Sequence, residues 1–305
     1  MRKEAVMDPD KLYDLFRIAP GARVDLNGRS TLPPPEFMRD DRDEVVKRIA
    51  ENNRRIARLQ NDLYFEGRQS LLIVLQALDA GGKDGTINNV FSAMNPQGCR
   101  VQSFKTPTPL EQSHDFLWRV HAVAPAAGEV VIFNRSYYEA VLIEKVHGYA
   151  TAKEIAFRYK AINQFEELLD FHRTRIVKFY LHISKEEQLR RFVRRLKSPE
   201  KHWKISANDY PERKYWNDYI RAFEAALENC STAVAPWFVI PADSKTFRNL
   251  AVSAIILRTL ESMKISVPEP SVDLEKTRKL AAIELAAQRR EKNRRRRDEK
   301  KTERK

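Results

Sequence analysis

The sequence contains only two cysteines, Cys99 and Cys230, among 305 residues. So few thiols exclude a scaffold held by disulfides and any metal site built from several cysteines. No stretch approaches the ~18–20 uninterrupted apolar residues of a membrane-spanning helix. The start of the chain, Met1 to Asp10, has basic residues but lacks the apolar segment of a secretory signal. We therefore expect a soluble, cytoplasmic protein that does not enter the membrane.

The sequence has few acidic residues relative to basic ones. It contains 42 Asp and Glu and 55 Lys and Arg, which gives a net charge of +13. The excess is concentrated near the C-terminus, where residues 289–305 hold 11 Lys or Arg and four Asp or Glu, a net +7. This segment has almost no apolar residues, so we expect residues 268–305 to form a solvated tail that is disordered or a frayed helix. The tail either keeps the protein in solution or attracts a polyanion such as RNA, DNA or an inorganic polymer.

Five short apolar runs lack the alternation of a half-exposed strand, which is typical of strands buried on both faces of a parallel sheet. Segments with helical periodicity lie between them. Strand and helix alternating in this way predict a three-layer α/β/α fold with a five-stranded parallel sheet. The predicted strands are Leu71–Ala77, Arg100–Phe104, Glu129–Phe133, Arg175–Ile183 and Trp237–Pro241.

The predicted helices define one domain of residues 40–267, preceded by an N-terminal extension of residues 1–39. The extension contains a short amphipathic stretch and a proline-rich loop, and the domain begins with a long helix. The helices are expected at residues 10–18, 40–68, 85–94, 109–122, 151–171, 185–196, 208–229 and 244–263.

Residues 79–86, with the sequence DAGGKDGT, follow the first predicted strand and lead into a helix. The glycines let backbone N–H groups turn toward phosphate oxygens, the helix adds its positive N-terminal end, and Lys83 adds a point charge. This combination predicts a phosphate-binding loop, with an ordinary strand-to-helix turn as the alternative.

The loop departs from the pattern G-x-x-x-x-G-K-[ST]. Ala77 stands in place of the first glycine, and Asp84 stands where the metal-binding Ser or Thr would be. Asp79 would repel phosphate unless a cation lies between them. The acidic residue therefore favours Mg²⁺ at Asp79.

The third predicted strand ends in Asn134 and Arg135. Ligands of parallel sheets bind at the carboxyl ends of the strands, so both residues face the phosphate loop if their strands are neighbours. A guanidinium can donate to two oxygens of a transferred phosphoryl group. The alternative is a solvated arginine that caps the following helix. Lys105, just beyond the second strand, is at the same sheet edge.

Residues 188–210 combine a cationic helix with a loop that contains proline and tryptophan. Arg191 and Arg195 are four residues apart, so both project from one helical face. The pattern resembles the arginine lid of small phosphotransferases, which closes over phosphates and excludes water. A solvated charged helix is the alternative. The basic side chains that would suit an anionic channel are Arg190, Arg191, Arg194, Arg195, Lys197, Lys201 and Lys204.

Seven segments, in order along the chain, resemble the polyphosphate kinase 2 family of P-loop kinases, which move phosphate between inorganic polyphosphate and nucleotides. The resemblance implies Mg²⁺ as cofactor, polyphosphate and adenine nucleotides as partners (with guanine nucleotides as an alternative), and a homo-oligomer, either dimer or tetramer. The segments are DAGGKDGT (79–86), NPQG (95–98), SFKTPT (103–108), HDFLWR (114–119), FNRSYYE (133–139), PEKHWK (199–204) and APWFVIPAD (235–243).

The resemblance also implies roles for individual residues. The implied catalytic residues are Asp79, which would hold Mg²⁺, Lys83, which would grip phosphates, and Arg135 and Arg191, which would flank the transferring phosphoryl group. Asn134 stands where many relatives carry a metal-binding aspartate, and together with Glu139 it is similar to the class III subgroup, which accepts both AMP and ADP. The residues expected to bind substrate are Gly81, Gly82, Asp84, Gly85, Thr86, Lys105, Asn134, Glu139, Arg195, Lys201 and Lys204.

Two other functions share some of these features. A nucleotide or small-molecule kinase that uses ATP as donor would have the same fold, metal and lid. A nucleic-acid-binding protein could use the basic tail, although the phosphate loop and Asp79 lie inside the folded unit and the basic run lies outside it. The sequence favours Mg²⁺-dependent transfer between polyphosphate and nucleoside mono- and diphosphates, so that AMP and ADP become ADP and ATP.

Overall fold

The computed structural model describes residues 9–37 and 42–302, except for the side chains of residues 297–302. The chain forms two compact units, Met1–Ser266 and Val267–Lys305, which are described separately. In the first unit, residues 9–37 pack on the rest. Leu12 is fully buried in the core, and the N–H of Ile18 donates to the carbonyl of Trp237 over 2.8 Å.

Five parallel strands in the described part of the first unit form one sheet, in the order β2-β3-β1-β4-β5. Each begins and ends within one residue of its prediction, and the expected α/β fold is confirmed. The strands are β1 (Ser70–Gln76), β2 (Cys99–Ser103), β3 (Val130–Asn134), β4 (Thr174–His182) and β5 (Trp237–Pro241).

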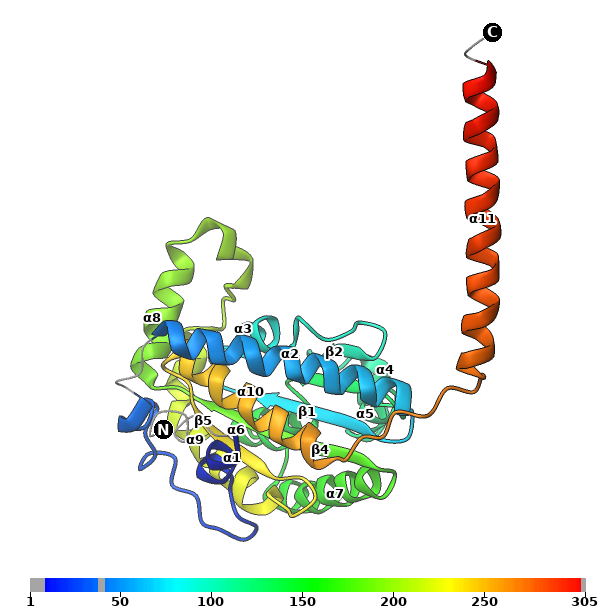
Figure 1. The fold of residues 1–305 in the computed structure, drawn as a ribbon. Helices are drawn as coiled ribbons and strands as arrows, with labels where there is room; N and C mark the ends of the chain where they lie inside the picture. The colour runs from blue at the N-terminus through cyan, green and yellow to red at the C-terminus, as the bar shows by residue number, and fades with distance from the viewer. Residues whose placement is uncertain (1–8, 38–41, 303–305) are drawn as a thin grey trace. The chain divides into compact units, whose positions relative to one another are not determined.

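Helices cover both faces of the sheet (Figure 1). Alternate side chains of β1 enter different cores: Leu71 and Ile73 pack with residues of α1, α2 and α10, whereas Leu72 and Val74 pack with residues of α7 and α9. Because both faces of β1 are buried, the strand has an uninterrupted apolar sequence. The longer helices are α1 (Pro9–Phe16), α2 (Arg42–Glu66), α7 (Ala152–Phe171), α8 (Lys185–Leu196), α9 (Trp216–Cys230) and α10 (Lys245–Ser262).

The prediction of one helix over residues 109–122 is wrong. The segment forms two short helices, α4 (Pro109–Gln112) and α5 (Trp118–His121). The carboxylate of Asp115 accepts the N–H of Leu117 over 2.9 Å, a local turn that competes with helical hydrogen bonding.

Helical turns elsewhere also differ from the sequence prediction. The helix expected over residues 85–94 begins earlier, as α3 (Lys83–Thr86), and widens into the π-helix η2 (Ile87–Phe91). After β3, η3 (Tyr137–Val141) and α6 (Ile143–Val146) form turns that were not predicted. The turns η4 (Pro199–Lys204) and η5 (Pro211–Tyr215) lie between α8 and α9.

The second unit contains α11 (Leu274–Thr302), a helix of 29 residues. Residues 267–273, which precede this helix, have no regular secondary structure. Its apolar side chains, Leu280 and Ile283 among them, are exposed. Within the described residues, no helix has both the length and the apolar character needed to cross a membrane.

Candidate active site

The phosphate loop connects β1 to α3 through a sharp turn. Ala80 and Gly82 adopt left-handed backbone conformations, with φ of 60° and 107°. A Cβ atom at position 82 would also meet the guanidinium of Arg248, which would have to move. Thr86, in the first turn of α3, is buried, and its hydroxyl donates to the carbonyl of Gly82 over 3.2 Å. The loop therefore has one tightly packed conformation.

Lys83 lies inside the loop. Its Nζ donates to the carbonyl of Ala77 over 2.9 Å. Burial, together with the nearby charge of Arg135, lowers the pKa of Lys83 to about 8. The ammonium group is still mostly charged near neutral pH, and it has lost much of its hydration before any ligand binds.

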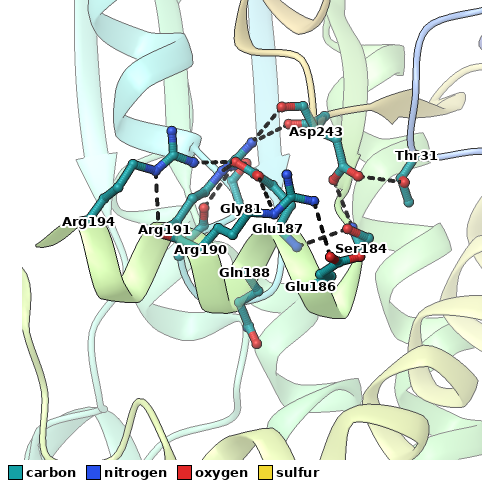
Figure 2. Close-up of polar contacts among 12 residues, drawn as sticks. Thr31, Gly81, Ser184, Glu186, Glu187, Gln188, Arg190, Arg191, Arg194 and Asp243 are labelled. Carbon is teal, nitrogen blue, oxygen red and sulfur yellow. Dashed lines mark hydrogen bonds and ion pairs between the residues drawn. The ribbon is translucent and has the colours of Figure 1, made fainter.

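Side chains of helix α8 hold the phosphate loop by donating hydrogen bonds to the backbone carbonyls of the loop (Figure 2). Gln188 Nε2 donates to the carbonyl of Asp79 over 3.0 Å, and Arg191 Nη1 donates to the carbonyls of Ala80 and Gly81, each over 2.9 Å. The two α8 side chains thus hold three consecutive carbonyls that would otherwise lack partners at a strand-to-helix turn.

Arg191, which lines the same cavity as Arg195, is also held by several protein groups. Arg191 is buried, and its Nε donates to Glu187 one turn earlier over 2.9 Å (Figure 2). Its Nη2 donates to the carbonyl of Ala242. The guanidinium is occupied by the loop, by Glu187 and by the end of β5, which makes Arg191 a support of the loop.

The end of β3 lies beside the loop, as expected if the strands are neighbours. β1 and β3 are adjacent and parallel, with Leu75 opposite Asn134. Arg135 Nη2 donates to Asp79 Oδ1 over 2.9 Å. Burial alone would lower the pKa of Arg135, but the charges of Glu139 and Asp79 outweigh burial and raise it.

Two more predicted residues meet at Asp84. Asn134 Nδ2 donates to Oδ1 of Asp84 over 3.0 Å, and Lys204 Nζ donates to Oδ2 over 3.0 Å. Burial would raise the pKa of Asp84, but the hydrogen bonds from Lys204 and Asn134 outweigh it and lower the pKa. Arg195 Nη1 in turn donates to the carbonyl of Lys204 over 3.3 Å. Lid, loop and β3 are therefore joined through one carboxylate.

A cavity of about 540 Å³ opens on one side of the loop, at Ala80, Gly82 and Gly85. None of the described residues that line it is acidic, so its walls carry only positive charge. The cationic lining residues are Arg42, Arg191, Arg194, Arg195, Lys201, Lys204, Lys245 and Arg248.

Two further cavities are lined by acidic, basic and aromatic side chains together. One, of about 340 Å³, is lined by Asp79, Arg135 and Glu139 together with Trp216 and Tyr219. The other, of about 460 Å³, shares Arg135 and Glu139 and adds apolar and aromatic walls. Lys105 lines this third cavity and not the cationic one.

The sequence prediction missed Lys245 and Arg248, both on α10. Burial and the nearby Arg191 lower the pKa of Arg248 to about 10, and its guanidinium donates to Asn249. A signal was present, because α10 follows β5 and its first turn must lie at the carboxyl edge of the sheet. Arg42 and Gln188 were also missed as site residues, and their positions depend on tertiary packing.

A glycine-containing loop with a half-buried lysine, placed at the carboxyl edge of a parallel sheet beside a cation-lined cavity, defines a phosphotransferase of the P-loop kinase type. Residues 39–268 match the family model of polyphosphate kinase 2. The chain therefore belongs to the polyphosphate kinase 2 family.

Individual relatives support this assignment. The chain is 44% identical over 261 residues to an AMP/ADP-polyphosphate phosphotransferase of Meiothermus ruber, covering 86% of this chain and 97% of the relative. It is 42% identical over 266 residues to an ADP-polyphosphate phosphotransferase of Rhodopseudomonas palustris, covering 83% and 91%. The crystal structure of polyphosphate kinase 2 from Arthrobacter aurescens superposes with a TM-score of 0.85 at 41% identity, covering 90% of this chain and 96% of that one.

Proposed function

We propose that this chain transfers phosphoryl groups between inorganic polyphosphate and adenine nucleotides, and that the cation-lined cavity holds the polymer. Polyphosphate carries about one negative charge per phosphate, so a wall of eight cations without an acidic lining residue suits it better than it suits a single nucleotide. This cavity is the observation that carries the proposal.

The nucleotide belongs on the other side of the loop. The cavities there combine Arg135 and Glu139 with aromatic and apolar side chains, the surroundings expected around a base and a ribose. The phosphate loop, which lines cavities on both sides, would then receive the transferring group between donor and acceptor. Lys83 and Arg135 would neutralise the charge that develops on this group, and Arg191 would keep the loop in shape.

We further propose that Mg²⁺ binds at Asp79 together with the substrate. Among the described residues, no three His, Cys, Asp or Glu side chains gather in a metal-binding cluster. Asp79 and Glu139 nevertheless line one cavity, and Mg²⁺ is commonly held by one or two carboxylates with water and substrate phosphates as its other ligands. When bound, the ion would neutralise phosphate charge, while Arg135 keeps the Asp79 carboxylate oriented toward the site.

Both AMP and ADP are proposed acceptors, as in the class III subgroup. The name of the Meiothermus ruber relative, AMP/ADP-polyphosphate phosphotransferase, supports this assignment. Glu139 is the residue we expect to help position the shorter nucleotide, since it accepts a hydrogen bond from Gln76 over 3.2 Å and lines both nucleotide-side cavities. A guanine nucleotide is the alternative substrate, supported by a GDP-polyphosphate phosphotransferase of Mycobacterium tuberculosis that is 32% identical.

The test is a donor and acceptor matrix. Purified protein with Mg²⁺ is mixed with polyphosphate or ATP as donor and with AMP, ADP, GMP or GDP as acceptor, and the products are separated by chromatography. The proposal expects ADP and ATP to form from AMP and ADP with polyphosphate. Turnover with ATP alone as donor would identify an ATP-dependent kinase instead, and failure of AMP alone would remove only the class III assignment.

The proposal also covers the limits of the kinase domain, the cellular location of the protein and its oligomeric state. We place the kinase domain at residues 40–267, with the lid at about residues 188–210, and the protein in the cytoplasm as a homodimer or homotetramer. The similarity to relatives over most of their length supports the domain limits. Sedimentation equilibrium of the full chain would measure the assembly.

A further inference from the structure

A fully buried polar cluster lies behind the strand end that carries Arg135. Glu166 of α7 and Lys178 of β4 have no exposed side-chain surface, and Oε2 of Glu166 is 2.6 Å from Nζ of Lys178. Tyr137 and Tyr138 of η3 both donate to Oε1 of the same carboxylate, over 2.8 and 2.9 Å. Lys178 also donates to the hydroxyl of Tyr138 over 2.8 Å.

Each polar group of the cluster has a partner. The third donor of Lys178 reaches the carbonyl of Cys230 over 2.6 Å. Burial raises the pKa of Glu166 and lowers that of Lys178, so each charge depends on its partner. A buried ion pair is weak evidence of stabilisation, because apolar side chains of similar volume in its place often give a folded protein of equal or greater stability. A complete network of this kind fixes positions instead.

The two tyrosines connect the cluster to the active site. Arg135 lies two residues before Tyr137 and has a φ of 62°, a strained conformation for a non-glycine residue that persists only where the surroundings hold it. Toward the active site, Arg135 donates a hydrogen bond to Asp79, and Glu139 accepts one from Gln76. On the core side, the same five-residue segment is held by the tyrosine hydroxyls.

We propose that Glu166 and Lys178 are positioning residues for phosphoryl transfer, which act through Tyr137 and Tyr138 on the guanidinium of Arg135. The inference rests on the proposed function, in which Arg135 faces the transferring group. Phosphoryl transfer depends on the placement of charge, so a shift of Arg135 by a fraction of an ångström lowers kcat even when substrates still bind.

The test variant is Tyr137→Phe with Tyr138→Phe, which keeps both rings and removes both hydroxyls. The matched control is Tyr180→Phe on β4, since the hydroxyl of Tyr180 is also buried but has no hydrogen-bond partner. We expect kcat for ADP phosphorylation by polyphosphate to fall about 10- to 100-fold in the double variant, with less than about a threefold change in either KM. The control should keep its kcat.

A double-mutant cycle with Arg135→Lys separates positioning from simple loss of stability. If the hydroxyls act through Arg135, removing them should cost much less in the Arg135→Lys background than in the native chain. Circular dichroism and thermal unfolding establish that each variant is folded at the assay temperature. Should the double variant not fold, Tyr137→Phe alone, which leaves the contacts between Tyr138, Glu166 and Lys178 intact, takes its place.

Two results overturn the inference. One is a folded double variant with unchanged kcat, and the other is an additive effect in the cycle with Arg135→Lys. Failure of the proposed function is distinguishable from either, because the native chain itself would then give no nucleotide product from polyphosphate.

Discussion

Lys204 and Asp84 form an ion pair of 3.0 Å that joins the lid to the phosphate loop. The same carboxylate accepts the amide of Asn134, so three segments far apart in the sequence meet at one residue. A phosphate that enters the cationic cavity would compete with Asp84 for the ammonium group of Lys204. Lys204 lines this cavity, so the ion pair links the cavity wall to the loop.

Lys204→Ala should weaken polyphosphate binding. Removal of a charged hydrogen-bond donor of this kind costs about 1.5–3 kcal/mol, so the KM for polyphosphate should rise about 10- to 150-fold. Lys197→Ala is the matched control, because Lys197 is an exposed lysine of the same lid and does not line the cationic cavity. Steady-state kinetics with polyphosphate varied at saturating ADP measures both, and equal KM values in the two variants would contradict the assignment.

Asp79→Asn should lower turnover by orders of magnitude, because the amide keeps the shape of the side chain but loses the charge that would hold Mg²⁺. Chelation of divalent ions by EDTA should abolish the activity of the native chain, and added Mg²⁺ should restore it. The assay is ATP formation from ADP and polyphosphate. A variant as active as the native chain would remove Asp79 from the metal site.

Lys83→Ala should cost about 2–4 kcal/mol of transition-state stabilisation, the range found for single charge-stabilising groups. The fold should survive, since Lys83 makes a single hydrogen bond, to the carbonyl of Ala77. The ratio kcat/KM gives the loss, and circular dichroism gives the fold. An unfolded variant would show instead that the lysine is structural.

The pH dependence follows from the same lysine, whose pKa burial lowers to about 8. A lysine is charged below its pKa, so kcat/KM should be retained on the acidic side and fall as the pH rises through about 8. Lys83→Arg should extend activity to higher pH, because a guanidinium keeps its proton. Rates measured between about pH 6 and pH 10 would show the alkaline limb. If kcat/KM fell at the same pH in both proteins, the alkaline limb would belong to a titrating group other than Lys83.

Arg191→Ala should destabilise the first unit as well as reduce activity. Glu187 keeps its contact with Arg194, but the carbonyls of Ala80 and Gly81 lose their donor, and a buried polar group without a partner costs about 1–3 kcal/mol. Arg195→Ala, from the same helix but only partly buried, should cost less than about 1 kcal/mol. Thermal unfolding of both variants checks the difference. Equal melting temperatures would mean that Arg191 does not support the loop.

Truncation after Pro270 should leave turnover on short polyphosphate nearly unchanged. The basic segment of net +7 would raise the local concentration of long polymers, so their apparent affinity should weaken in the truncated protein, and more at low salt than at high salt. KM values for short and long chains at two ionic strengths measure the effect. A folded truncated protein without activity on short chains would place the tail in the catalytic machinery.

The sheet was predictable because its strands are buried on both faces and have uninterrupted apolar sequences, as Leu71–Leu75 has. The phosphate loop and Arg135 were predictable because strand ends in a parallel sheet meet at one edge. The role of Arg191 was not, since a helical arginine can point to a ligand or to a backbone carbonyl, and only tertiary packing decides. The contact of Arg248 with Asn249 likewise depends on tertiary packing, although the place of α10 after β5 was a signal for a site residue.

The phosphate loop lines the cationic cavity with Ala80, Gly82 and Gly85 and lines a nucleotide-side cavity with Asp79. In the proposed function, a phosphoryl group that passes from one cavity to the other would meet the same charges in either direction. By microscopic reversibility, the path that consumes the polymer is also the path that lengthens it. Mass action then sets the net direction of the reaction. A high ratio of ADP to ATP would favour consumption of the polymer, and a low ratio would favour its growth.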